Sequence, residues 1–203
     1  MTRVLRPLGT GLGMVLLMTV ALGLLYPLAM TGVIQGLFPA EADGSLVRVD
    51  GTVVGTDLAG QAFTSPLYFH SRPSATTPAY DPSATTFANL GPNNIALEDA
   101  VTANIDAALE LERPYNPGLT AAGLPVDMVT TSGSGVDPDI TPANALVQSH
   151  RIAAVRSIEH RLVVQLIREH TTGRGLGFLG QPRVNVLRLN IALDQLAGPP
   201  EAR

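Results

Sequence analysis

The feature that most constrains this chain is a run of 34 residues, positions 7–40, without a single Asp, Glu, Lys, Arg or His. Residues 8–25 form an apolar stretch broken only by Gly and Thr. A helix of that length rises about 27 Å, close to the hydrocarbon core of a bilayer at about 30 Å. We therefore predict a transmembrane helix over residues 8–30, with Tyr26 and Pro27 near its interfacial end.

The charges on either side of this span predict its orientation. Arg3 and Arg6 precede it, whereas Glu41 and Asp43 follow it. The positive-inside rule then places residues 1–7 in the cytoplasm and residues 41–203 outside. The alternative is a signal peptide cleaved near Ala40, but the apolar region of a signal is shorter, about 7–15 residues, so the retained anchor is favoured.

Composition excludes several function classes. The chain of 203 residues has room for one domain beyond the span, and it contains neither Cys nor Lys. Thiolate nucleophiles, Cys-ligated metals, a Schiff-base lysine and the lysine of a P-loop are therefore absent. Residues 41–203 carry 11 Arg against 17 carboxylates, a net charge of −6, which argues against nucleic acid as a partner.

The rest of the chain alternates short apolar runs with turn residues. We expect a hairpin about Asp50-Gly51, further strands at 61–69, 125–129 and 184–187, and an irregular segment over 73–92. Helices are expected after the caps Asn94 and Thr141, over 151–170 with a break near Ser157, and through Leu193 and Leu196. The predicted fold class is one N-terminal transmembrane helix followed by a small mixed α/β extracytoplasmic domain.

Two glycine-rich segments imitate functional motifs. Gly175, Gly177 and Gly180 match G-x-G-x-x-G, but a helix precedes them and a strand follows, the reverse of a dinucleotide site, so a simple turn is favoured. The segment 132–139 offers hydroxyls and carboxylates without calcium-loop spacing, which favours a capped turn over a cation site. The four histidines, at 70, 150, 160 and 170, form no H-E-x-x-H motif, and we predict no metal site.

Several segments together resemble a known family. They are Tyr-Phe-His-Ser-Arg-Pro-Ser-Ala at 68–75, Asn-Leu-Gly-Pro-Asn-Asn at 89–94, Pro-Val-Asp-Met-Val-Thr at 125–130, the turn at 132–142, and Gly-Phe-Leu-Gly-Gln-Pro-Arg-Val-Asn-Val at 177–186 with Leu-Asn at 189–190 and Leu-Asp at 193–194. In this order, and with the N-terminal span, they resemble the C subunits of the Kdp potassium-transporting P-type ATPase. The resemblance covers nearly the whole chain.

The resemblance implies an accessory, non-catalytic subunit of an ATP-driven potassium import complex in the bacterial inner membrane. Its partners would be a channel-like A subunit that selects K⁺ and a catalytic B subunit that hydrolyses ATP, so the complex, not this chain alone, handles both. The family is described as a catalytic chaperone that raises the B subunit's affinity for ATP, with a glutamine implicated; Gln148 matches that position. The family usually has Pro where this chain has His150, and often Gly where it has Ser71.

No catalytic residue is assigned, and the interface candidates come from the segments that carry the resemblance. They are Tyr68, Phe69, His70, Arg72, Asn89, Asp137, Arg151, Arg183 and Asn185. The topology puts Gln148 outside, away from cellular ATP, so direct nucleotide contact is expected to be minor or absent. The alternative function is a membrane-anchored extracytoplasmic hydrolase that assembles scattered Ser, His and Asp.

Overall fold

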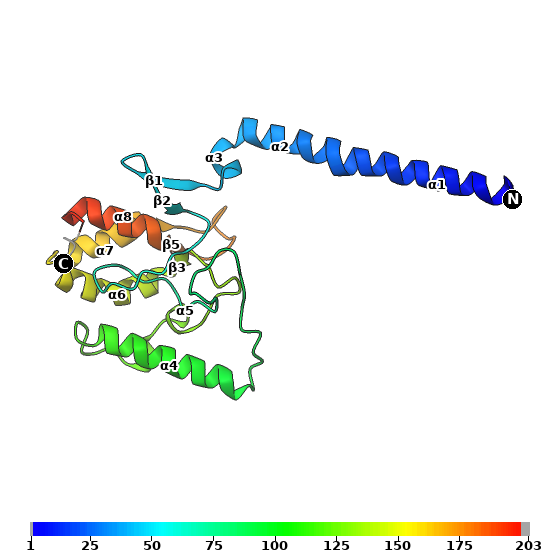
Figure 1. Cartoon of the computed structure of the whole chain (residues 1–203). Coiled ribbons are helices and arrows are strands. Elements are labelled where there is room, and N and C mark those ends of the chain that lie inside the picture. The colour runs from blue at the N-terminus through cyan, green and yellow to red at the C-terminus, as the bar shows by residue number, and fades with distance from the viewer. Residues whose placement is uncertain (1, 200–203) are drawn as a thin grey trace. The chain divides into compact units, whose positions relative to one another are not determined.

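The computed structural model describes residues 2–199 and divides into two compact units, residues 1–46 and 47–203. Figure 1 shows both units, each of which is described by itself below. The first unit is one long helix, formed by α1 (Thr2–Val20), a π-helical turn (Ala21–Leu25) and α2 (Tyr26–Leu37), followed by the short α3 (Pro39–Ala42). The helix thus extends seven residues past Met30, the predicted end of the span.

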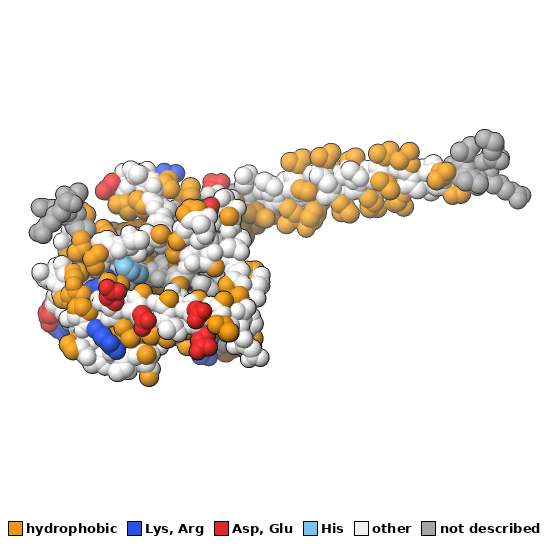
Figure 2. All heavy atoms as spheres, turned by 60° about the horizontal axis from the view of Figure 1, so that its bottom comes forward, with side chains coloured by type: hydrophobic (Ala, Val, Ile, Leu, Met, Phe, Trp, Pro, Cys, Tyr) orange, Lys and Arg blue, Asp and Glu red, His pale blue; other side chains and the backbone are white. Residues whose placement is uncertain are grey.

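This helix is long and apolar enough to cross a membrane. Residues Pro7–Leu37 form the candidate span, with a mean hydropathy of 2.1 over its best window. Exposed hydrophobic side chains are spread along it from Leu8 to Leu37 (Figure 2). Its π-helical turn ends two residues before Pro27, which lacks a backbone N–H and so cannot bond the carbonyl four residues earlier. At the end of the turn the N–H of Tyr26 bonds the Ala21 carbonyl, five residues earlier, as in a π-helix.

The second unit begins with the predicted hairpin. Strands β1 (Leu46–Val49) and β2 (Thr52–Thr56) pair, and both turn residues have positive φ, 50° at Asp50 and 80° at Gly51. This is the geometry that an Asp-Gly turn favours. The hairpin prediction is therefore confirmed.

The core lies between three helices and a small sheet. Strands β3 (Asp139–Ile140), β5 (Arg183–Asn185) and β4 (Thr171–Thr172) form an antiparallel sheet in the order β3-β5-β4, with Ile140 and Thr171 opposite Val184. Helices α6 (Pro142–Val155) and α8 (Val186–Ala197) pack on β5, and α7 (His160–Glu169) packs against both of these helices. The buried core includes Phe69, Ile140, Ala145, Ile152, Val163, Ile167, Val184, Leu189 and Leu193.

The remaining helices flank this core. Helix α4 (Ile95–Glu112) begins at the predicted cap, where the Asn94 side chain accepts a hydrogen bond from the backbone of Ala96, and packs on α5 (Val126–Val129) and α6. Thr141 caps α6 as predicted, bonding the N–H of Asn144. The break between α6 and α7 also falls where expected, but Ser157 adopts a φ of 55° and the cap position is Glu159.

Three strand predictions were wrong or displaced. Residues 125–129 form the helical turn α5, because the Asp127 carboxylate turns back to accept hydrogen bonds from the backbone and hydroxyl of Thr141. Val186 and Leu187 open α8, since the Asn185 side chain caps that helix and confines β5 to Arg183–Asn185. Residues 61–69 are irregular, because side chains rather than a neighbouring strand satisfy part of this backbone.

Candidate functional site

A network of buried polar side chains holds residues 68–72 between α6 and α8. Asn190 of α8 accepts a hydrogen bond from the N–H of Phe69 at 2.8 Å and donates one to its carbonyl at 3.0 Å. Gln148 of α6 repeats this on the next residue, His70, at 2.7 and 3.0 Å. We call Gln148 and Asn190 the amide clamp. Each amide bonds both the N–H and the carbonyl of one residue, as a neighbouring β-strand would, because an amide offers a donor and an acceptor side by side.

Gln148 is fully committed to this role. Its side-chain oxygen also accepts a hydrogen bond from the Arg151 guanidinium at 2.9 Å, and its nitrogen also donates to Asn144 at 2.8 Å. All of its hydrogen-bonding capacity is therefore used within the domain, and the residue is 1% exposed. Contact between Gln148 and any ligand would require one of these four bonds to break.

A buried ion pair lies beside the clamp. The Arg151 Nε donates to Glu112 at the end of α4 at 2.9 Å, and both side chains are 0% exposed. The same guanidinium donates to the carbonyls of Pro66 and Tyr68, so it ties α4 and α6 to the clamped segment. One Glu112 oxygen, Oε2, has no hydrogen-bond partner among the described residues.

Burial governs the protonation of this network. Burial raises the pKa of Glu112, and the neighbouring Arg151 acts in the opposite direction. The pKa of His70 is lowered, first by burial; its hydrogen bond to the Ser65 carbonyl opposes this, and the charge of Arg151 adds to it. His70 therefore favours the neutral form inside the domain.

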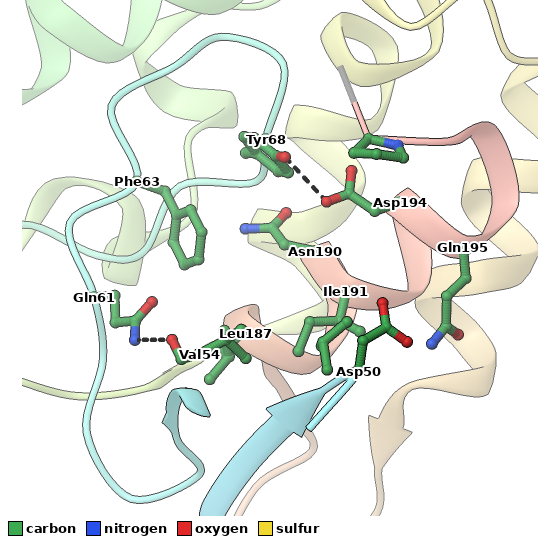
Figure 3. Close-up of a pocket in the computed structure, with 12 residues that line it drawn as sticks. Asp50, Val54, Gln61, Phe63, Tyr68, Leu187, Asn190, Ile191, Asp194 and Gln195 are labelled. Atoms are coloured by element: carbon green, nitrogen blue, oxygen red, sulfur yellow. Dashed lines mark hydrogen bonds between the residues drawn. The ribbon is translucent and has the colours of Figure 1, made fainter. Parts of the chain in front are cut away.

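Two cavities are lined in part by the clamp residues, the first by Asn190 and the second by Gln148. The first, of about 460 Å³, lies between the hairpin, residues 61–68 and α8, and is lined mainly by apolar side chains such as Val54, Phe63 and Leu187 (Figure 3). Tyr68 reaches across it to donate a hydrogen bond to Asp194 at 3.0 Å, while Arg156 pairs with the other Asp194 oxygen. The second, of about 270 Å³, lies between α4 and residues 70–73.

The long segment 73–92 is irregular as predicted, and it docks on the turn 132–137. Ser74 donates a hydrogen bond to the Gly135 carbonyl at 2.6 Å, and the N–H of Thr86 bonds the Ser134 carbonyl at 3.2 Å. Within the turn, the hydroxyls of Ser132 and Ser134 accept hydrogen bonds from the N–H groups of Gly135 and Val136. The expectation of a capped turn is confirmed.

The sequence-predicted site residues divide into four groups. The clamp brings together five of them: Tyr68, Phe69, His70, Gln148 and Arg151. Phe69 and Arg151 are 0% exposed, so these two lie in the interior of the domain and not on its surface. Arg72 pairs with Asp137 at 3.1 Å. Arg183 pairs with Asp139 at 3.0 Å, and Asn185 caps α8 and bonds the Asp57 carbonyl. Asn89 is exposed, with a φ of 50°.

Glu112 and Asn190 complete the site; sequence reasoning missed Glu112, and it placed Asn190 only among the residues that carry the family resemblance, without assigning it to the site. Both lie on the apolar face of a helix, Glu112 three residues after the buried Leu109 and Asn190 directly after the buried Leu189. A carboxyl or amide at such a position is the signal, because buried polar groups require partners and so mark a network. Their partners at 69 and 151 are remote in sequence and could not be assigned from spacing.

One Ser–His pair, Ser149 and His160, lies within hydrogen-bonding distance, as the alternative hydrolase function would require. Ser149 Oγ lies 2.8 Å from His160 Nε2, and the same hydroxyl donates to the Leu146 carbonyl at 2.6 Å. A hydroxyl has one proton, so the imidazole must donate in this pair and does not act as a base toward Ser149. Ser149 is also fully buried, and His160 stacks on His150 with ring centroids 4.3 Å apart.

The G-x-G-x-x-G segment forms a closed turn between β4 and β5, as predicted. The N–H groups of Gly175 and Gly177 are bonded to the carbonyls of Leu179 and Arg174. A phosphate site needs such amides free and aimed at the ligand from a helix N-terminus. The turn therefore lacks the arrangement that the fingerprint requires.

The fold and the site together define a domain that follows a candidate membrane span and whose buried polar side chains hydrogen-bond to other groups of the same domain. The chain belongs to the KdpC family: it matches the family described as "KdpC: K+-transporting ATPase, c chain" over residues 8–195. It is thus a subunit of a potassium-transporting ATPase, with a role in potassium transport.

Curated relatives agree over nearly their full length. A "Potassium-transporting ATPase KdpC subunit" of Caulobacter vibrioides is 50% identical over 191 residues, which cover 94% of this chain and 92% of that protein. Proteins of the same name from Methylococcus capsulatus and Koribacter versatilis are 48% and 44% identical, and cover 90% and 96% of this chain and 94% and 97% of their own lengths.

Proposed function

We propose that this chain is a non-catalytic accessory subunit that anchors in the bacterial inner membrane, holds its domain on the extracytoplasmic side of that membrane, and stabilises the assembly of the potassium pump. The domain docks on the outer face of the channel-like A subunit. ATP is hydrolysed by the catalytic B subunit, and K⁺ is selected by the A subunit. The observation that carries the proposal is the amide clamp, in which every polar group of Gln148 serves the domain's own structure.

The clamp also suits an indirect effect on nucleotide affinity. Gln148 positions residues 68–72, so a change there alters the shape of the domain and, through the complex, the state of the catalytic subunit. In this proposal Gln148 is a positioning residue and touches no nucleotide. A direct role would require ATP to reach a side chain that is 1% exposed.

The decisive experiment compares the purified complex with and without this chain. We expect potassium-stimulated ATP hydrolysis to fall severalfold without it, while the full chain alone in detergent shows no saturable ATP binding by calorimetry. Undiminished hydrolysis in its absence would contradict the accessory role. Saturable ATP binding by the chain alone would contradict the indirect role of Gln148.

The orientation is tested with single cysteines, because the chain has none of its own. In intact cells stripped of their outer membrane, a membrane-impermeant maleimide is expected to label the exposed position Ser83→Cys and not Thr2→Cys. After permeabilisation both positions react, which serves as the control. Labelling of Thr2→Cys alone in intact cells would reverse the topology.

A further inference from the structure

The loop that joins β4 to β5 exposes an unusual amount of apolar surface. We call residues 173–182 the apolar loop. Leu176 is 84% exposed, Phe178 68% and Leu179 54%, three large hydrophobic side chains within four positions. Single exposed apolar residues are common on proteins, but clusters of this kind mark interaction sites.

The backbone of the apolar loop is closed on itself. Gly175 and Leu179 exchange hydrogen bonds, with N···O distances of 2.9 and 2.8 Å, and the N–H groups of Gly177 and Phe178 bond the carbonyls of Arg174 and Gly175. Burying a backbone polar group without a partner costs free energy. Because these groups are already paired within the loop, their burial against a partner would not add this cost.

The loop includes a backbone conformation that is energetically unfavourable for a leucine. Leu176 adopts a φ of 52° and is followed by Gly177 at 83°. The left-handed conformation is unfavourable for a leucine by about 1 kcal/mol. A pre-formed shape lowers the entropy lost on binding to a partner of fixed shape, whereas a fluid bilayer requires none. The chain moreover has a candidate membrane span already, so a second lipid contact would add little.

The surrounding charges define the partner's chemistry. Residues 170–193 contain Arg174, Arg183 and Arg188 and no Asp or Glu, although residues 41–203 carry a net charge of −6. Arg183 and Arg188 pair with Asp139 and Asp57, and within the described residues Arg174 has no ion pair. The matching surface is an apolar recess with a carboxylate near its edge.

We propose that the apolar loop is the element by which the domain docks on the channel-like A subunit of the ATPase, with Leu176, Phe178 and Leu179 in an apolar recess and Arg174 against a carboxylate of that subunit. This inference rests on the proposed accessory role, since it names the surface through which that role is exercised. Phe178 is the central anchor, because it lies between Leu176 and Leu179 and aromatic side chains are enriched at protein interfaces.

A single reporter tests the burial of this loop. Phe178→Cys, the only thiol in the chain, is labelled with an environment-sensitive fluorophore in the assembled complex in lipid nanodiscs, and Ile95→Cys, at an exposed site on α4, is the matched control. We expect a blue shift and loss of iodide quenching at 178 only when the other subunits are present. The same shift in nanodiscs that hold this chain alone, with quenching by spin-labelled lipids, would assign the loop to the bilayer and overturn the proposal, as would a probe that stays exposed to water in the complex.

A second measurement separates this inference from the proposed function. The double variant Phe178→Ala/Leu179→Ala is expected to reduce co-purification with the other subunits at least tenfold, while the melting temperature of the isolated full chain in detergent stays within 2 °C of the parent. Normal co-purification of this variant, with loss only when the whole chain is omitted, would overturn the loop assignment and leave the accessory role intact. Assembly and activity without the chain would overturn both.

Discussion

At the scale of single residues, the domain depends on polar side chains that replace missing backbone partners. Phe69 and His70 lie where a strand would need a neighbour, and Asn190 and Gln148 supply the missing donors and acceptors. The clamp works only if both amides are held rigidly. Arg151 and Asn144 provide that rigidity for Gln148, since they occupy its remaining donor and acceptor positions.

Removal of one clamp residue should therefore be costly. Asn190→Ala leaves the buried N–H and carbonyl of Phe69 without partners, and we expect the free energy of unfolding to fall by about 2–4 kcal/mol. Urea unfolding of the full chain in detergent measures this. Gln195→Ala, on the exposed face of the same helix, is the control and should change stability by less than about 0.5 kcal/mol. Equal effects of the two substitutions would contradict the clamp.

His70 makes stability depend on pH. Its pKa is lowered in the folded domain, chiefly by burial, from the ordinary value of 6.5. Folding therefore favours the neutral imidazole, and this contribution to stability is present above pH 6.5 and is lost as the pH falls through and below that value. We expect the free energy of unfolding of the parent to fall more steeply between pH 7.5 and 5.5 than that of His70→Gln. Parallel curves would show that His70 does not contribute.

The buried ion pair predicts that two substitutions of Glu112 lower the stability of the domain by different amounts. Glu112→Leu leaves the Arg151 charge buried without its carboxylate, which should cost about 3–5 kcal/mol. Glu112→Gln keeps an acceptor for the guanidinium and should cost less. Thermal denaturation of the two variants ranks them, and a leucine variant at least as stable as the glutamine variant would contradict a structural role for the pair.

At the scale of elements, the long segment 73–92 is held against the turn 132–137 through a glycine. Gly135 has a φ of 74°, and a Cβ there would lie 2.7 Å from the Thr86 carbonyl oxygen and 2.8 Å from the Thr76 methyl group. Both the backbone conformation and the space thus require glycine at this position.

Substitution at this glycine should release the segment. We expect Gly135→Ala to lower the free energy of unfolding by about 1–3 kcal/mol and to speed limited proteolysis within residues 73–92. Gly133→Ala is a close control, because nothing lies within 4 Å of a Cβ at that position. Unchanged proteolysis in Gly135→Ala would mean that the segment is not held by this contact.

At the scale of the whole molecule, the second unit has its own core and network. The buried cluster and the amide clamp are formed entirely by residues of the unit 47–203. We expect this segment, expressed alone, to unfold cooperatively in urea with a midpoint close to that of the full chain in detergent. A non-cooperative transition would show that the domain requires the N-terminal helix to fold.

Sequence reasoning was correct where the structure depends on residues close together in the chain, and it failed where residues further apart interact. The Asp50-Gly51 hairpin, the caps Asn94 and Thr141 and the apolar helix were predicted correctly, because each depends on residues within a few positions of one another. The strand expected at 125–129 failed, because Asp127 bonds to Thr141, fourteen residues further along the chain.

The sequence by itself determined the candidate membrane span, the local caps and turns, and, through the blocks of residues at 68–75 and 177–186, the family. Only the tertiary structure decided the roles of those blocks: the first is clamped inside the domain, and the second includes the tip of an exposed loop. The physical reason is that burial and hydrogen-bond partners join residues about 80 to 120 positions apart, as for Gln148 with His70 and Asn190 with Phe69. Neither local propensity nor hydrophobic periodicity encodes such pairings.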